Sequence, residues 1–408
     1  MTPPPSPDRR TLKRALTLPL VMLYGLGVTI GAGIYVLVGA AAAEAGIYAP
    51  VSFLVATVGV AFTALSYAEL ATRYPVSAGE AAYVRAGFRS RTLSLVIGLM
   101  VAVTGVISSA AISIGAAAYV RHFVDLPPGL AVTLIILLLG VAAAWGIVES
   151  IVIAAILTLL EIGGLLLVVY QAVTVNPDLA ASLGDLVPPA EIGAWTGIFA
   201  ASLLAFFAFI GFEDMVNVAE EVKRPGKTLP RAIILTLVVA TALYIVVVSV
   251  AVLTIPMDQL ATSAAPLALL FGEASGAARN LFNAIAVVAT VNGVLVQMIM
   301  GSRVLYGLSV QGSLPAWLGY VSPLTRTPVV TTAIVVAVTL LLALLLPIAD
   351  LAETASRIVL VVFLVVNIAL WRLGPPSEPA PPDIFRVPRW VPAAGVGTCL
   401  VLLVFGLL

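Results

Sequence analysis

The feature that most constrains this chain is a series of eleven long apolar segments. They cover residues 17–43, 49–72, 92–118, 129–147, 150–172, 196–220, 229–254, 279–309, 329–347, 351–372 and 391–408. A helix crosses the hydrocarbon core of a bilayer in about 20 residues. Backbone groups in lipid must pair within the segment, which favours helices. Because 61% of the 408 residues are hydrophobic and only 10% are charged, we expect an all-α polytopic membrane protein.

The composition also excludes several kinds of partner. The net charge is zero, which gives no basic surface for a nucleic acid. A single cysteine, Cys399, excludes an intramolecular disulfide and a cysteine-based metal cluster. A single histidine, His122, excludes a multi-histidine metal site. We therefore expect no cofactor.

Basic residues predict the orientation of the spans. With the N-terminus in the cytoplasm, all but Arg121, Arg279 and Arg357 of the 20 lysines and arginines fall on the cytoplasmic side. The positive-inside rule favours this topology. We therefore expect a multi-pass protein of the cell membrane with a cytoplasmic N-terminus.

The sixth apolar segment is not a plain membrane helix. It begins the stretch FFAFIGFEDMVNVAEEVKRPGKTLPR, residues 206–231, which carries Gly211, Glu213 and Asp214 at depth. An acid at the centre of a membrane helix costs about 2.5–3.5 kcal/mol on insertion scales. The pattern predicts a helix broken at Ile210-Gly211 that faces a cavity.

The first apolar segment has a similar interruption, in GLGVTIGAGIYVLVG, residues 25–39. Glycines there predict an unwound turn, although close helix packing is the alternative. Free N–H groups at the start of the following half-helix suit a carboxylate, and free carbonyls before it suit an ammonium group. The candidate residues for this part of the site are Thr29, Ile30, Gly31, Ala32, Gly33 and Ile34.

The sixth segment would supply the other side of the site. Carbonyls at Phe207, Ala208 and Ile210, next to Gly211, would face the same ligand. Phe206, Phe207 and Phe209 are candidates for an aromatic lid, with Phe207 preferred, although ordinary packing is the alternative for each. An anion-binding end beside a cation-binding end suits a zwitterion.

The two interrupted segments divide the chain into two sets of five spans. We expect a cytoplasmic tail over 1–16 and a ten-helix core over 17–372, with repeats at about 17–172 and 196–372. A proline-rich cytoplasmic linker over 373–390 and an eleventh helix over 391–408 would follow. An odd number of spans inverts the second set, as in secondary transporters whose broken helices form the binding site.

Four stretches in order resemble the amino acid–polyamine–organocation superfamily, near its cationic-amino-acid-transporter-like bacterial branch. They are GVTIGAGIY, then SYAELATRYPVSAGEAAYVRAGF (66–88), then FFAFIGFEDMVNVAEEVKRPGKTLPRAI, then SRVLYGLSVQGSLPAWLGYVSPLTRTPVV (302–330). Within the second stretch, Glu69 and Arg73 have the spacing of a helical ion pair. The four stretches spread over most of the ten-helix core.

The resemblance implies a five-plus-five inverted-repeat core of the leucine-transporter type with broken helices 1 and 6, plus one extra C-terminal helix. It implies that the substrate carboxylate binds at Ala32 and Gly33, and the amine at carbonyls of Thr29, Phe207 and Ile210. Glu213 matches a glutamate linked to proton coupling in some relatives. Many members have twelve helices, whereas this chain has eleven apolar segments.

Glu161 is the second candidate for proton coupling, beside Glu213. It lies alone in the apolar run AAILTLLEIGGLLLVVY, where burial favours the protonated form. A neutral structural acid is the alternative. Relatives often carry a lysine at the matching position, so their coupling mechanism does not transfer directly. Polar residues at depth in other spans are candidates either for lining the pathway or for joining helices: Thr104, Ser108, Ser109, Asn292 and Asn367.

Together these features predict a secondary transporter of amino acids that works by alternating access, with the proton as coupling ion, and not an enzyme. An amino acid/amine exchanger (antiporter) of the same fold is the alternative. A sensor that binds amino acids without transport and a channel are weaker ones. The apolar candidates favour a neutral substrate, although Glu161 would instead attract a cationic side chain.

Overall fold

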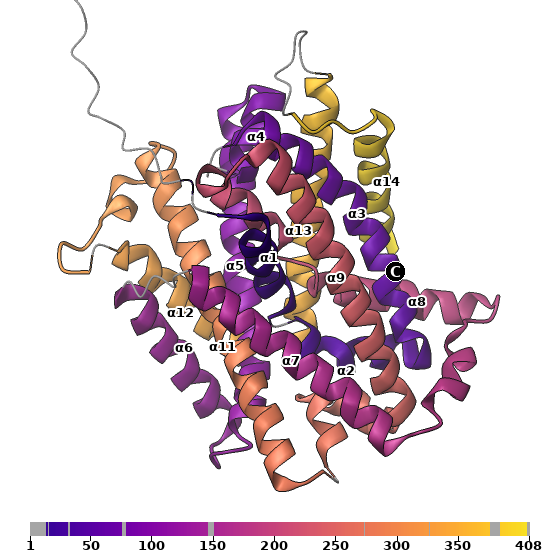
Figure 1. Ribbon diagram of the computed structural model, residues 1–408. Helices are drawn as coiled ribbons and strands as arrows, with labels where there is room; N and C mark the ends of the chain where they lie inside the picture. Colours follow the sequence, from indigo (N-terminus) through magenta and orange to yellow (C-terminus); the bar gives the residue numbers. More distant parts are fainter. Residues whose placement is uncertain are drawn as a thin grey trace, which may run out of the picture.

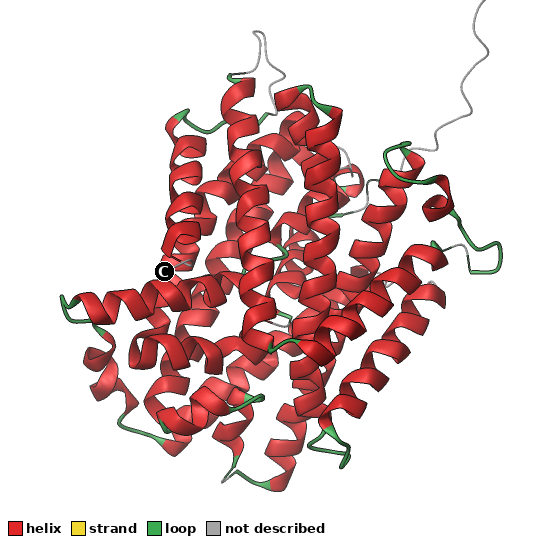
Figure 2. Ribbon diagram, turned by 180° about the vertical axis from the view of Figure 1, so that it is seen from behind, coloured by secondary structure: helices red, strands yellow, loops and turns green. Residues whose placement is uncertain are grey.

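The computed structural model describes residues 14, 16–31, 33–75, 79–145, 151–272, 274–325, 327–375 and 384–405. Across these ranges the chain is helical and forms no strand (Figures 1 and 2), apart from one isolated bridge between Leu16 and Val222. The α-helices are α1 (Leu18–Ile30), α2 (Gly33–Ala45), α3 (Ala49–Arg73), α4 (Gly79–Phe88), α5 (Arg91–Val120), α6 (Pro128–Trp145), α7 (Ile151–Val175), α8 (Ile192–Phe207), α9 (Pro225–Thr254), α10 (Met257–Thr262), α11 (Gly276–Val310), α12 (Val329–Leu345), α13 (Ile348–Leu373) and α14 (Trp390–Phe405). The 3₁₀ helices are η1 (Gly46–Tyr48), η2 (Leu179–Leu186), η3 (Phe212–Glu221), η4 (Pro266–Phe271) and η5 (Ala316–Gly319).

Each of the eleven apolar segments coincides with a helix or with a pair of helices. Eight candidate spans are long and apolar enough to cross a bilayer, while α1, α12 and α14 are shorter apolar helices. Many outward-facing side chains on these helices are apolar, as at Leu138 and Val141 of α6, which are 68% and 63% exposed. A surface of this kind is stable against lipid rather than water. The chain is a multi-pass helical membrane protein.

Local signals in the sequence explain where several helices begin. Ser90 and Ser275 accept hydrogen bonds from the N–H groups of Leu93 and Ala278 and so cap α5 and α11. Prolines occupy the first turn of α1, α3 and α9, where the missing N–H leaves no bond unmade. The short helices α4 and α10 lie between spans and were not predicted from the apolar pattern.

The short helix α1 lies near the centre of the view in Figure 1, and it packs against α7 and α9. The long helices α5 and α11 pack along each other, and α13 packs against α5. At the periphery, α6 packs against α12, and α14 packs against α13 and α3. This arrangement surrounds the first interrupted helix with protein, so its free backbone groups are shielded from lipid.

A polar cluster joins α13 to α3 inside this bundle. Asn367 is fully buried and accepts a hydrogen bond from the Ser66 hydroxyl at 2.7 Å. Its Nδ2 donates to the Thr63 hydroxyl at 2.8 Å and to the carbonyl of Phe363 at 2.9 Å. Of the two roles considered for this asparagine, the contacts support that of a link between helices. A Cβ on Gly395 would lie 2.4 Å from Asn367 Oδ1, so α14 also packs closely here.

We predict that Asn367→Ala destabilises the protein by about 1–2 kcal/mol, because the hydroxyls of Ser66 and Thr63 lose a buried partner. The measurement is thermal unfolding in detergent, followed by the loss of monodisperse protein. Ser66→Ala removes one of these bonds and serves as the control, with a smaller expected effect. Equal stability of Asn367→Ala and the unmodified protein would contradict the prediction.

Candidate functional site

The first interruption separates α1 from α2, as the glycine motif predicts. Helix α1 ends at Ile30, Gly31 forms a turn, and α2 begins at Gly33. The N–H of Gly31 still donates to the carbonyl of Gly27 at 3.1 Å, so the helix ends with a normal last turn. Ala32, a candidate carboxylate ligand, lies outside the described residues. The first N–H groups of α2 have no partner within their own helix, and they form its positive end.

The second interruption follows α8, which ends at Phe207. The N–H groups of Ala208, Phe209 and Ile210 donate to carbonyls three residues earlier, at 2.9–3.1 Å, and so tighten the helix end. Gly211 then has φ +120°, a conformation that favours glycine. The chain continues as the 3₁₀ helix η3 (Phe212–Glu221) instead of an α-helix. The predicted break at Ile210-Gly211 is therefore confirmed.

The two breaks pack directly against each other. A Cβ added to Gly33 would lie 2.5 Å from Cα of Ala208. A Cβ added to Gly211 would lie 2.8 Å from the carbonyl oxygen of Val28. Real side chains do not approach backbone so closely, so each glycine is required for the backbone of the other break to fit.

A tyrosine from α9 joins the two breaks. The Tyr244 hydroxyl lies 2.8 Å from the carbonyl oxygen of Thr29 and 2.8 Å from that of Ala208. A hydroxyl has one proton to donate, so the two carbonyls share it. These carbonyls are two of those expected to meet an ammonium group, and they compete for the single proton of the tyrosine. Sequence reasoning did not include Tyr244, which lies in an otherwise apolar span.

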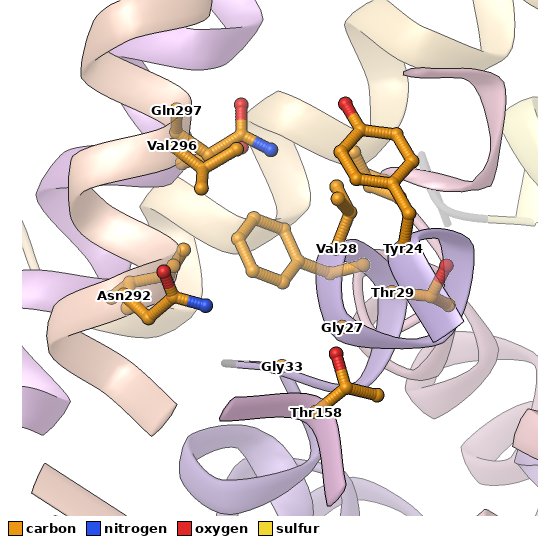
Figure 3. A pocket seen from close by; sticks show the side chains of 14 residues that line it. Tyr24, Gly27, Val28, Thr29, Gly33, Thr158, Asn292, Val296 and Gln297 are labelled. Carbon is orange, nitrogen blue, oxygen red and sulfur yellow. The ribbon is translucent and has the colours of Figure 1, made fainter. Parts of the chain in front are cut away.

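A cavity lies between the breaks and the helices α5, α7 and α11 (Figure 3). In Figure 3, Tyr24 and Val28 of α1 lie across it from Asn292 and Gln297 of α11. None of the described lining residues carries a charged side chain. They are Tyr24, Gly27, Val28, Thr29, Gly33, Ser108, Ile112, Thr158, Phe207, Ile210, Asn292, Gly293, Val296 and Gln297.

Four of the candidate binding residues line this cavity: Thr29, Gly33, Phe207 and Ile210. The other described candidates are buried next to it without forming its wall: Ile30, Gly31, Ile34, Ala208, Phe209 and Gly211. Of the three aromatic lid candidates only Phe207 reaches the cavity. Phe206 packs edge-on against Phe363, with 5.8 Å between the ring centroids. Phe209 packs in the same way against Tyr244, with 5.0 Å between the ring centroids.

The cavity wall holds polar groups that the protein itself does not satisfy. The hydroxyls of Thr29 and Ser108 are buried, and neither has a hydrogen-bond partner among the described residues. Buried polar groups are normally paired, so two unpartnered hydroxyls on residues that line one cavity are unusual. Ser108 and Asn292 were considered from sequence as pathway residues. Thr158 and Gln297 were missed, although each is a polar residue inside an apolar run.

Glu161 lies behind the first break. It is fully buried on α7, and its Oε1 accepts a hydrogen bond from Nδ2 of Asn292 at 3.3 Å. A Cβ on Gly31 would lie 3.7 Å from the same oxygen. The Tyr35 hydroxyl donates to the backbone carbonyl of Glu161 at 2.6 Å. The carboxylate therefore lies beside the break and meets the cavity wall through Asn292.

Glu213 lies at the second break, in the wall of an adjoining cavity. Its Oε2 accepts a hydrogen bond from the N–H of Gly211 at 2.9 Å. Glu80 and Asp214 line the same cavity, which shares Ile210 and Gln297 with the first one. Three carboxylates therefore line this adjoining cavity, one from α4 and two from η3. Sequence reasoning singled out Glu213 but missed Glu80.

Glu80 lies on α4, outside the membrane spans, and is buried. The Tyr67 hydroxyl donates to its Oε1 at 3.2 Å. Burial nevertheless raises the pKa of Glu80, because removal from water disfavours the charged form. Beyond Glu80 a third cavity continues along α11 to Arg303 and Gln311. Successive shared wall residues therefore connect the breaks to the α4 end of the molecule.

Comparisons with a family model and with individual proteins point to membrane permeases and transporters. The amino acid permease family matches residues 17–408. The chain is 30% identical to the branched-chain amino acid permease BcaP of Bacillus subtilis, over 97% of this chain and 88% of that protein. It is 30% identical to the vacuolar cationic amino acid transporter 4 of Arabidopsis thaliana, over 88% of this chain and 63% of that protein. It is 28% identical to a methylthioribose transporter of Bacillus subtilis, over 96% of this chain and 88% of that protein.

We predict that Gly33→Ala destabilises the protein by about 1–3 kcal/mol, because the new methyl group overlaps the backbone of Ala208. Thermal unfolding in detergent measures the effect. Gly163→Ala is the matched control, since a Cβ there meets nothing within 4 Å. If the two variants unfold at the same temperature, the close contact between the breaks does not contribute to stability.

Proposed function

The chain belongs to the amino acid permease family, and from this premise we propose that it carries a neutral, apolar α-amino acid by alternating access. The family is one of membrane transporters, so the protein is a transporter and not an enzyme. The observation that carries the proposal is the uncharged cavity at the contact of the two breaks, with two buried hydroxyls that lack a protein partner.

In the proposed complex, the substrate carboxylate binds at the N-terminus of α2. The N–H groups of Ala32, Gly33 and Ile34 would receive it, supported by the positive end of the helix dipole. The ammonium group would bind carbonyls of Thr29, Phe207 and Ile210. Tyr244 already donates to the carbonyl of Thr29, and each carbonyl has a second lone pair that remains for the ligand.

The rest of the cavity wall supports the choice of a neutral side chain. Val28, Ile112 and Val296 offer apolar surface, and a cationic side chain would meet no charged partner among the described wall residues. The relatives are named for a branched-chain amino acid, cationic amino acids and methylthioribose. Because these substrates differ in charge, the choice for this chain rests on its own cavity wall.

We further propose that Glu161 and Glu213 couple transport to protons. Glu161, beside the first break, accepts a hydrogen bond from Asn292. Glu213, at the second break, accepts one from the N–H of Gly211. Such bonds are stronger to a carboxylate than to a neutral acid. Protonation would therefore weaken the link between each acid and its surroundings and change the relative stability of the two access states.

The proposed architecture is a pair of five-helix inverted repeats, at about 17–172 and 196–372, followed by α14. The support is that each set opens with an interrupted helix, α1–α2 in the first and α8–η3 in the second. The distribution of basic residues supports a cytoplasmic N-terminus in the cell membrane.

We predict that Thr29→Val and Ser108→Ala each raise the half-saturating substrate concentration about tenfold, which corresponds to one lost hydrogen bond of about 1.4 kcal/mol. The measurement is uptake of radiolabelled leucine into proteoliposomes. Ser52→Ala is the matched control, because it removes another buried hydroxyl without a partner, outside the cavity. Unchanged half-saturation in both variants would exclude these hydroxyls from the binding site.

We predict that Glu161→Gln abolishes leucine accumulation driven by an inward proton gradient while exchange of external for internal leucine continues. Glutamine keeps the size and the hydrogen-bond acceptor but cannot release a proton. Glu213→Gln is tested in the same way. Accumulation that persists in both variants would contradict proton coupling through these residues. An unmodified protein that ignores the gradient and requires internal amino acid would be an exchanger instead.

A further inference from the structure

A separate pocket, which shares no wall residue with the three cavities described above, lies where the end of α3, the end of α13 and the start of α14 meet. Its wall combines three arginines, one glutamate and several apolar residues. They are Glu69, Arg73, Leu370, Trp371, Gly374, Pro375, Arg386, Val387, Arg389 and Pro392. None of these residues belongs to the transport site, so the pocket requires an explanation of its own.

The end of α3 holds the residues directly before α14 in place. The N–H of Val387 donates to Oε2 of Glu69 at 2.8 Å, and the N–H of Phe385 donates to the Thr72 hydroxyl at 3.2 Å. Arg73 donates to the carbonyl of Gly374 at 2.7 Å. Backbone N–H groups within residues 384–389 are therefore bonded to side chains of α3. These bonds fix the backbone that carries the side chains of this segment.

The charges in the pocket leave an excess of guanidinium groups. Glu69 pairs with Arg73, as their helical spacing predicts, and its other oxygen accepts from Val387, so each carboxylate oxygen has a partner. Arg386 and Arg389 are exposed, and neither forms an ion pair with any residue in the described part of the chain. A Cβ on Gly374 would lie 4.0 Å from an Nη atom of Arg389, which places that guanidinium over the end of α13.

The pocket also lies at the boundary between lipid and water. It is built where one apolar helix ends, at Leu373, and the next begins, at Trp390. Trp371 and Trp390 are 55% and 61% exposed, and exposed tryptophans at helix ends are typical of the membrane interface. Farther along α14 the exposed side chains are apolar, as at Leu400 and Val404. Acyl chains would therefore contact the surface next to the arginines.

We propose that this pocket binds a phosphate group through Arg386 and Arg389, and that an anionic phospholipid supplies it. The planar guanidinium fork matches phosphate oxygens in a bidentate geometry. Basic pockets at helix ends on the cytoplasmic side favour anionic headgroups. A bound lipid would join α3, α13 and α14 at their ends and would thereby hold the peripheral helix against the bundle. Free inorganic phosphate offers the same oxygens without the acyl chains.

The test is native mass spectrometry of the delipidated full-length protein, with phosphatidylglycerol or phosphatidylcholine added at equal concentration. We expect retained phosphatidylglycerol in preference to phosphatidylcholine. The double variant Arg386→Ala with Arg389→Ala should bind phosphatidylglycerol about tenfold more weakly, as expected for the loss of charge-assisted hydrogen bonds. Adding inorganic phosphate in excess separates the two sources, since displacement of the lipid would assign the site to phosphate itself.

Two further variants make the result specific. Arg91→Ala with Lys223→Ala removes two exposed basic residues outside the pocket, and it should keep the preference for phosphatidylglycerol. Arg386→Lys with Arg389→Lys keeps the charge but not the guanidinium fork, and it should retain an intermediate affinity. The proposal is overturned if the alanine pair binds phosphatidylglycerol as the unmodified protein does, or if the control pair weakens binding equally.

Discussion

The contact between the two interrupted helices is the constraint on which the rest of the structure depends. Gly33 admits the backbone of Ala208, and Gly211 admits the backbone of Val28. Side chains at these glycines would separate the breaks, and the cavity beside them would lose its shape. Tyr244 adds a hydrogen-bond donor shared by the two segments. The unpaired backbone of each break is thus covered by the other break, which is what allows irregular backbone to persist inside a membrane protein.

Charge is arranged around this contact so that the central cavity has an uncharged wall. Glu161 lies behind the first break, and Glu213 lies beside the second, in the wall of the adjoining cavity with Glu80 and Asp214. Neither Glu161 nor Glu213 lines the central cavity. Under the proposed coupling, this arrangement would separate selection of the substrate from a change in protonation. At the opposite extreme, Arg386 and Arg389 are exposed at the surface of the protein.

Much of the candidate site follows from residue types at particular positions. Glycines and acids inside apolar runs are costly, so they predict both breaks and the importance of Glu161 and Glu213. The residues contributed by other helices were harder to predict. Thr158 and Gln297 are two of several polar residues on α7 and α11, and the sequence does not show which face of each helix is turned inward. Tyr244 and Glu80 are distant from the breaks in sequence, and only packing brings Tyr244 to Thr29 and Glu80 to Asp214.

The sequence by itself determined the number of apolar segments, their helical structure and the places where two of them are interrupted. The physical reason is that lipid cannot hydrogen-bond to the backbone, so length, hydropathy and glycine positions specify local structure directly. Only the tertiary structure decided which of the interrupted residues line the cavity and which turn away from it. Phe206, Phe207 and Phe209 are the same residue type in one short stretch. Phe207 lines the cavity, whereas Phe206 and Phe209 pack against other aromatic rings. That choice depends on the rotation of each helix against its neighbours, which no local pattern encodes.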